Sequence, residues 1–78
     1  MRETKPLSEL KPGQRGKVVK VAGKGVMHRR ILDMGIVPGV EIKVERVAPL
    51  GDPVDFKVLG YHLSLRREEA ENVYIEVL

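Results

Sequence analysis

The sequence predicts a small, mainly β protein, a barrel or sandwich built from five short strands. Five segments of strand length alternate or run apolar, and glycine, proline and aspartate separate them. Helical periodicity is confined to one short stretch after the first strand, and a single helical turn is expected before the last strand. The 78 residues correspond to a single domain covering residues 1–78, in which we expect residues 1–6 to be loosely ordered.

The chain is expected to open with one helical turn at residues 6–10, whose two leucines face inward. Pro12 and Gly13 then occupy the two central positions that a type II turn favours. The first strand covers about residues 16–22. Its three valines are too crowded for strict alternation, which indicates a bulge or burial on both faces.

A short helix is expected over residues 25–34. Met27, Ile31 and Met34 fall at positions i, i+4 and i+7 and form one apolar stripe. Gly35 follows, where a left-handed residue commonly closes the last turn of a helix. A proline-glycine pair three residues later supplies a second turn, which leads into the next strand.

The remaining strands are expected at residues 41–47, 54–58, 61–65 and 73–77. Residues 48–53 form a loop, because two prolines and a glycine in six residues prevent a ladder of hydrogen bonds. The two strands after this loop are separated by a leucine and a glycine and form a predicted hairpin. Residues 67–71 are polar and rich in helix formers, so they predict the single helical turn.

The composition excludes several classes of protein. Fourteen Lys and Arg residues against eleven Asp and Glu residues give a net charge of +3, with both signs scattered along the chain. The absence of cysteine excludes disulfides and thiolate metal ligands. The sequence contains no signal peptide and no run of about 18 apolar residues, so it predicts a cytoplasmic protein without direct membrane insertion.

The sequence shows no pattern of catalytic or cofactor-binding residues, and we therefore predict a protein that is not an enzyme and uses no cofactor. The segment 23–25 is too short for a phosphate-binding loop, and Ser64, two residues from His62, lacks the elbow and oxyanion hole of a serine nucleophile. The candidate metal ligands show no ligand spacing. They are His28, Asp33, Asp52, Asp55, His62 and Glu68. We predict no metal site, with weak transition-metal binding as an open alternative.

Four motifs, in this order, resemble the FeoA family. They are Leu10-x-x-Gly13-x-x-Gly16-x-Val18, then Arg30-Ile31-Leu32-Asp33-Met34-Gly35-Ile36-x-Pro38-Gly39, then Ala48-Pro49-Leu50-Gly51-Asp52-Pro53, and last Leu63-x-Leu65-Arg66-x-x-Glu69-Ala70. The resemblance spans residues 7–78, and it is specific because the second and third motifs occur together at this spacing.

The resemblance implies a small SH3-like β-barrel with a helix inserted after the first strand, also similar to the C-terminal domain of iron-dependent repressors. It implies a cytoplasmic accessory protein of a bacterial or archaeal ferrous iron uptake system. The expected partner is the membrane permease FeoB, which carries a cytoplasmic GTPase domain. Binding to that partner would bring the protein to the inner face of the membrane. The resemblance supplies no catalytic or metal-binding residues.

The favoured hypothesis is a protein-binding module that docks on the permease and modulates Fe(II) transport. We place its contact surface on the outer face of the helix and on the neighbouring loop tip. The residues of this surface are Met27, His28, Arg30, Pro49 and Leu50.

Other hypotheses remain open. A nucleic-acid-binding barrel is disfavoured by the scattered carboxylates, and it would use Lys17, Lys20, Lys24, Arg29 and Arg30. An Fe(II)-binding carrier is another alternative. Exposed strand edges also leave homo-oligomers open.

Overall fold

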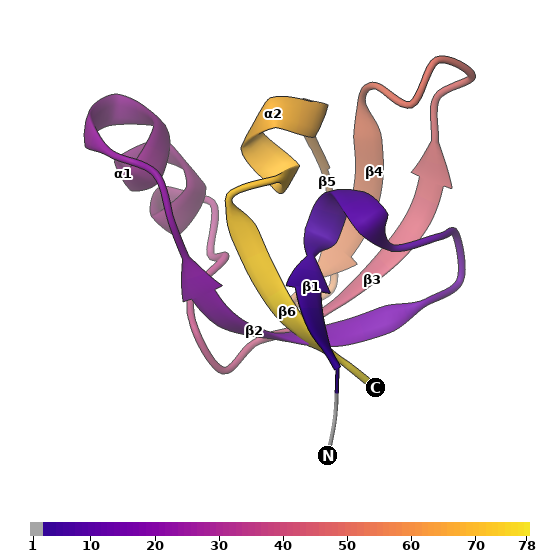
Figure 1. The fold of residues 1–78 in the computed structure, drawn as a ribbon, viewed down its shortest axis with the longest axis horizontal. Coiled ribbons are helices and arrows are strands. Elements are labelled where there is room, and N and C mark those ends of the chain that lie inside the picture. Colours follow the sequence, from indigo (N-terminus) through magenta and orange to yellow (C-terminus); the bar gives the residue numbers. More distant parts are fainter. Residues whose placement is uncertain (1–2) are drawn as a thin grey trace.

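A computed structural model describes residues 3–78 and shows a mainly β molecule with two short helices (Figure 1). Six antiparallel strands form one curled sheet in the order β1-β6-β2-β3-β4-β5. The strands are β1 (Thr4–Pro6), β2 (Arg15–Val21), β3 (Glu41–Val47), β4 (Val54–Val58), β5 (Tyr61–Leu65) and β6 (Val73–Val77). The helical segments are a 3-10 turn (Leu7–Glu9), α1 (Gly25–Asp33) and α2 (Arg67–Ala70). The predicted mainly β class is confirmed.

The structure has six strands, where the sequence predicted five. The additional strand is β1, which lies in the segment expected to be loosely ordered and pairs with β6. The three residues of β1 do not alternate between apolar and polar, and the last of them is a proline. The sequence therefore contains no indication of a strand here. A proline is tolerated here because β1 is an edge strand, where a missing N–H faces away from the ladder. Residues 1–2 lie outside the described part of the chain.

The other elements follow the predicted pattern closely. The strands β3, β4, β5 and β6 have the predicted bounds, and β4 and β5 form the predicted hairpin. The crowded valines of β2 coincide with a shift in its register against β6, between Val18 and Lys20. This bulge is the irregularity that their spacing indicated, and it leaves Val19 exposed while Val18 and Val21 are buried.

A single apolar cluster fills the space that the curled sheet encloses. Phe56, Ile42 and Val44 are completely buried, and they come from the central strands β3 and β4. Ile31 of α1 and Ile36, just after it, are also completely buried. The helix therefore adds its apolar stripe to the edge of the same core. No helix among residues 3–78 is long and apolar enough to cross a membrane.

The turns around α1 fasten this helix to the sheet. Gly35 has a φ of 92° and Gly39 a φ of 101°, the left-handed region that favours glycine. The Gly39 nitrogen donates to the Val18 carbonyl oxygen at 2.7 Å, and the Ala22 nitrogen donates to the Asn72 carbonyl oxygen at 2.6 Å. Segment 22–39 thus leaves the sheet and returns to it at two hydrogen-bonded points.

Candidate protein-binding surface

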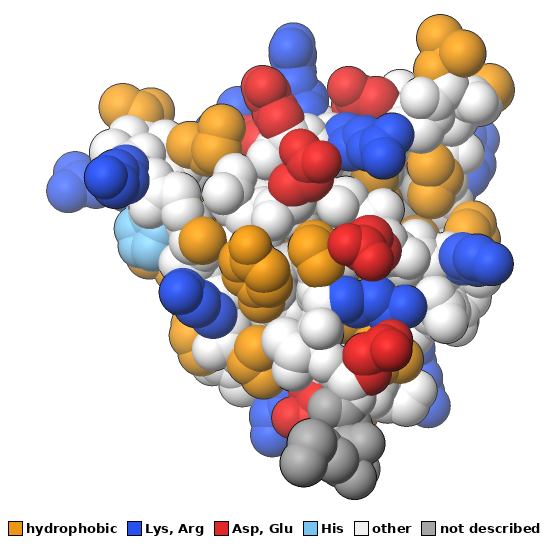
Figure 2. Space-filling model, in the orientation of Figure 1, with side chains coloured by type: hydrophobic (Ala, Val, Ile, Leu, Met, Phe, Trp, Pro, Cys, Tyr) orange, Lys and Arg blue, Asp and Glu red, His pale blue; other side chains and the backbone are white. Residues whose placement is uncertain are grey.

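The helix α1 and the loop 48–53 stand on either side of α2 (Figure 1). α1 follows the end of β2, the loop follows the end of β3, and α2 follows the end of β5. In Figure 2, charged side chains gather where α2 lies in Figure 1, and apolar side chains stand over the loop at the upper right. The predicted contact residues therefore occupy two places that α2 separates.

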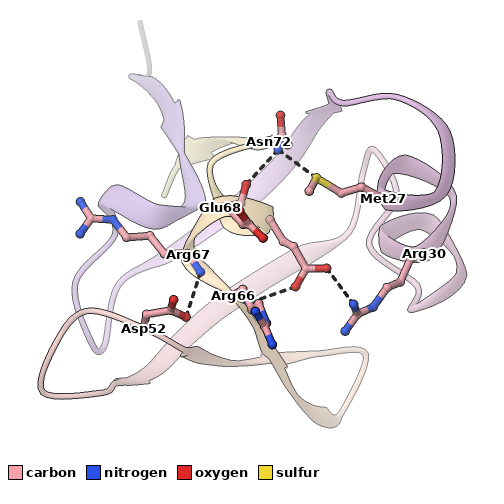
Figure 3. Close-up of polar contacts among 8 residues, drawn as sticks. Met27, Arg30, Asp52, Arg66, Arg67, Glu68 and Asn72 are labelled. Carbon is pink, nitrogen blue, oxygen red and sulfur yellow. Dashed lines mark hydrogen bonds and ion pairs between the residues drawn. The ribbon is translucent and has the colours of Figure 1, made fainter.

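Met27 is half-buried and faces α2. Its sulfur atom lies 3.3 Å from the side-chain nitrogen of Asn72, which donates to it. The same nitrogen also donates to the carbonyl oxygen of Glu68 at 2.9 Å (Figure 3). Met27 thus packs between the helix and the barrel, which leaves part of its side chain for an outside partner.

Arg30 joins α1 to α2 through an ion pair. Its guanidinium nitrogen Nη1 lies 3.2 Å from the carboxylate oxygen Oε2 of Glu69. The Glu69 side chain is almost completely buried, and its other oxygen accepts a hydrogen bond from the Arg66 backbone nitrogen at 3.0 Å (Figure 3). The Glu69 carboxylate therefore caps the first turn of α2 and also binds Arg30 of α1.

His28 is half-buried on α1. Its Nδ1 atom lies 3.3 Å from the carbonyl oxygen of Ala22, so an N–H at this position donates to the chain that leads into the helix. The most exposed large apolar residue of α1 is Val26, which is 85% exposed. The sequence analysis missed Val26, since it lies outside the apolar stripe of the helix.

The loop 48–53 presents its tip to solvent. Pro49 is exposed and Leu50 is 92% exposed, while the Gly51 nitrogen closes the turn by donating to the Ala48 oxygen at 2.7 Å. A carboxylate oxygen of Asp52 accepts a hydrogen bond from the Arg67 backbone nitrogen at 3.2 Å (Figure 3). These two hydrogen bonds fix the base of the loop to α2 and hold the turn that carries the exposed apolar tip.

A shallow groove separates α1 from α2 on this surface. Its volume is ≈ 320 Å³, and its lining residues are Val26, Met27, Arg30, Arg66, Glu68 and Glu69. The structure thus brings Met27 and Arg30 together with charged residues of α2. Pro49 and Leu50 form a separate point on the other side of α2. Two apolar projections flanking a charged centre can contact another macromolecule at two points.

The candidate metal ligands do not converge. Within residues 3–78, no group of three or more His, Asp or Glu side chains is placed to hold a metal ion. Nδ1 of His62 lies 2.8 Å from a Glu45 carboxylate oxygen, and the Ser64 hydroxyl donates to Asp55. The hydroxyl and the imidazole that the sequence places two residues apart are therefore each engaged by a carboxylate.

The bridge between the two helices gives the first testable prediction. Glu69→Ala is expected to lower the free energy of unfolding by about 2 kcal/mol, because it removes both the cap of α2 and the partner of Arg30. Glu68→Ala, one residue earlier and exposed, is the matched control and is expected to change it by less than about 0.5 kcal/mol. Urea denaturation followed by circular dichroism measures both values. Equal effects of the two variants would contradict this role of Glu69.

Comparison with known proteins finds relatives along almost the whole chain. A family model described as the FeoA domain matches residues 5–77. The Fe(2+) transport protein A/Fe(2+) transporter FeoB fusion protein of Porphyromonas gingivalis is 46% identical over 72 residues. That match covers 92% of this chain and 8% of the relative, so the chain spans a small part of this curated protein.

Solved structures share the fold. The FeoA-like protein of Clostridium acetobutylicum is 41% identical with a TM-score of 0.91, over 100% of this chain and 91% of that one. FeoA of Stenotrophomonas maltophilia, solved with zinc and described as a procaryotic SH3 domain protein, is 28% identical with a TM-score of 0.80, over 91% and 88% of the two chains. IdeR of T. acidophilum, at 20% identity and a TM-score of 0.86 over 96% and 34%, shares the fold alone. The predicted SH3-like architecture is confirmed.

Proposed function

Because this chain belongs to the FeoA family, we propose that it is an accessory protein of ferrous iron uptake that docks on the cytoplasmic, GTPase-bearing part of a FeoB-type permease. In this proposal it modulates Fe(II) transport and carries out no chemistry of its own. It works in the cytoplasm and reaches the inner face of the membrane through its partner.

The observation that carries this proposal is the fusion protein of Porphyromonas gingivalis. In that relative, a segment 46% identical to this chain is joined to a FeoB transporter in one polypeptide. A covalent link raises the effective concentration of one part near the other, which is useful when the two parts act together. The fusion supports association with FeoB for this chain as well.

The docking surface proposed here consists of the outer side of α1 and the tip of the 48–53 loop. It keeps the residues predicted from the sequence, Met27, His28, Arg30, Pro49 and Leu50, and adds Val26. The argument in its favour is exposure: Leu50 and Val26 are the most exposed of the large apolar side chains in residues 3–78. Apolar side chains that project next to arginine are favourable anchors for a protein partner, because their burial removes apolar area from water.

Leu50→Asp and Val26→Asp test the docking surface. Each variant is expected to weaken binding to the purified cytoplasmic domain of the permease at least about tenfold, since a carboxylate would be buried in an apolar contact. Tyr61→Asp is the matched control, because Tyr61 is also apolar and 70% exposed but lies on β5, at the far end of the hairpin from the loop. Biolayer interferometry with the immobilised domain measures the dissociation constants.

The outcomes of this experiment separate the surface from the function. Unchanged binding by both aspartate variants would reject the surface and leave the partner in place. Failure of the wild-type chain to bind the permease domain would reject the docking itself. Fe(II) uptake by vesicles containing the permease, with and without the chain, then tests the proposed modulation.

A further inference from the structure

The outer face of the sheet carries a row of basic residues that the proposed function does not use. Arg15 of β2 lies directly opposite Lys43 of β3, and Lys43 lies directly opposite Lys57 of β4. All three side chains are exposed, because the neighbours Ile42, Val44 and Val58 on these strands point into the core. The three positive charges therefore stand side by side across three strands.

The row lines a shallow groove of ≈ 400 Å³. Its lining consists of the three basic residues, the turn residues Gly13, Leu59 and Gly60, and one acidic residue, Glu41. The row lies at the starts of β2 and β3, whereas α1 follows the end of β2 and the loop 48–53 follows the end of β3. It is thus separated from both parts of the proposed docking surface by most of the length of a strand.

The packing of the chain does not account for this row. Like charges directly opposite each other on neighbouring strands are destabilising. Arg15 is offset by Glu41, whose carboxylate oxygen lies 3.2 Å from its Nη1 atom. Neither Lys43 nor Lys57 takes part in an ion pair within residues 3–78, unlike the exposed cations Arg30 and Arg46. A ligand that neutralises the two lysines would remove the repulsion.

The neighbouring charges restrict the shape of such a ligand. Glu41 and Glu45 are exposed on the same face of β3, on either side of Lys43. A broad anionic surface, such as a membrane or a nucleic-acid duplex, would meet these carboxylates together with the lysines and be repelled by them. A narrow chain that carries carboxylates can follow the row without reaching Glu45, which does not line the groove, and it meets Glu41 only where that carboxylate is already paired with Arg15.

From this register and charge pattern, we propose that the groove across Arg15, Lys43 and Lys57 binds an extended acidic peptide segment of a partner protein. The ammonium groups of the two lysines form ion pairs with carboxylates of the segment, and Arg15 holds a further carboxylate at the end of the row. The contact is electrostatic and exposed, so it is weak and sensitive to salt.

The test uses the full chain and a fluorescein-labelled hexaglutamate peptide, with binding followed by fluorescence anisotropy in low-salt buffer. The double variant Lys43→Gln and Lys57→Gln is expected to weaken binding about fivefold or more, because two ion pairs are lost. The matched control is Lys20→Gln with Lys24→Gln, two exposed lysines outside the groove, which removes the same net charge. The control is expected to change binding less than about twofold.

A stability measurement accompanies the titration. The same Lys43 and Lys57 variant is expected to melt at or above the temperature of the wild-type chain, because the repulsion across β3 and β4 is removed. Reduced binding by a chain of undiminished stability separates loss of a binding surface from loss of the fold. A lower melting temperature than the control would mean that the lysines support the fold, and it would overturn the proposal.

Other probes decide between classes of partner. The two further probes are anionic phosphatidylserine vesicles and a short single-stranded DNA. The peptide assignment would be overturned if either probe bound the wild type more tightly than hexaglutamate does and lost this binding in the Lys43 and Lys57 variant. The proposal would also be overturned if the Lys43 and Lys57 variant and its control lost the same share of hexaglutamate binding. Absence of hexaglutamate binding by the wild type would overturn it as well. None of these measurements involves the permease, so their outcome is independent of the docking test for the proposed function.

Discussion

Gly16→Val is expected to lower the free energy of unfolding by about 3 kcal/mol. A Cβ atom at this position would lie 2.8 Å from Cδ1 of Ile75 and 3.2 Å from the carbonyl oxygen of Glu76. Neither atom can retreat easily, because Ile75 is completely buried and Gly16 is paired both with Val77 of β6 and with β3. Urea denaturation monitored by circular dichroism gives the free energy.

Gly13→Ala is the matched control for this variant. A Cβ atom at Gly13 would meet no other atom within 4 Å, but the φ of Gly13 is 90°, which an alanine adopts with strain. The expected loss is about 1 kcal/mol. A loss for Gly16→Val no larger than that for Gly13→Ala would show that β2 and β6 can separate to admit a side chain, against the close contact described above.

Phe56→Ala is expected to lower the free energy of unfolding by about 4 kcal/mol, which approaches the whole stability of many small domains. Phe56 is the single phenylalanine of the chain and is completely buried. It stands between Val44 and Leu63 in the register of β3, β4 and β5, so a cavity there loosens three strands. Thermal unfolding by calorimetry measures the change.

Two further variants keep this prediction testable if the alanine variant does not fold. Phe56→Leu retains most of the apolar volume and is expected to lose about 1 kcal/mol. Tyr61→Ala removes an aromatic side chain that is mostly exposed, and it is expected to change stability by less than about 0.5 kcal/mol. A comparable loss at Tyr61 would contradict the placement of the core between β3 and β4.

The fold could be predicted from the sequence wherever the burial of one face makes apolar residues recur at regular spacing. The strands β3 and β4 alternate between buried and exposed residues, and their bounds followed from this pattern. α1 was recognised from its stripe and from Gly35. β1 was not, because a three-residue edge strand carries no such pattern and is specified by its pairing with β6.

The surface was harder to predict because its contacts join residues far apart in the chain. Arg30 and Glu69 are 39 positions apart, and their ion pair depends on how α1 and α2 pack, which no local pattern encodes. The basic row depends on the register of β2 against β3, which brings Arg15 opposite Lys43. Leu50 was assigned to the surface because it lies at the tip of a predicted loop, and its side chain is exposed there.

The two hydrogen-bonded points at which segment 22–39 leaves the sheet and rejoins it have a consequence for evolution. Since the segment begins and ends on fixed backbone partners, changes at its exposed positions, such as Val26 and Arg29, leave the pairing of the strands untouched while the buried Ile31 and Ile36 are kept. The barrel can then stay constant while the outer side of the helix diversifies. Members of such a lineage can acquire different binding preferences on a common platform without refolding it.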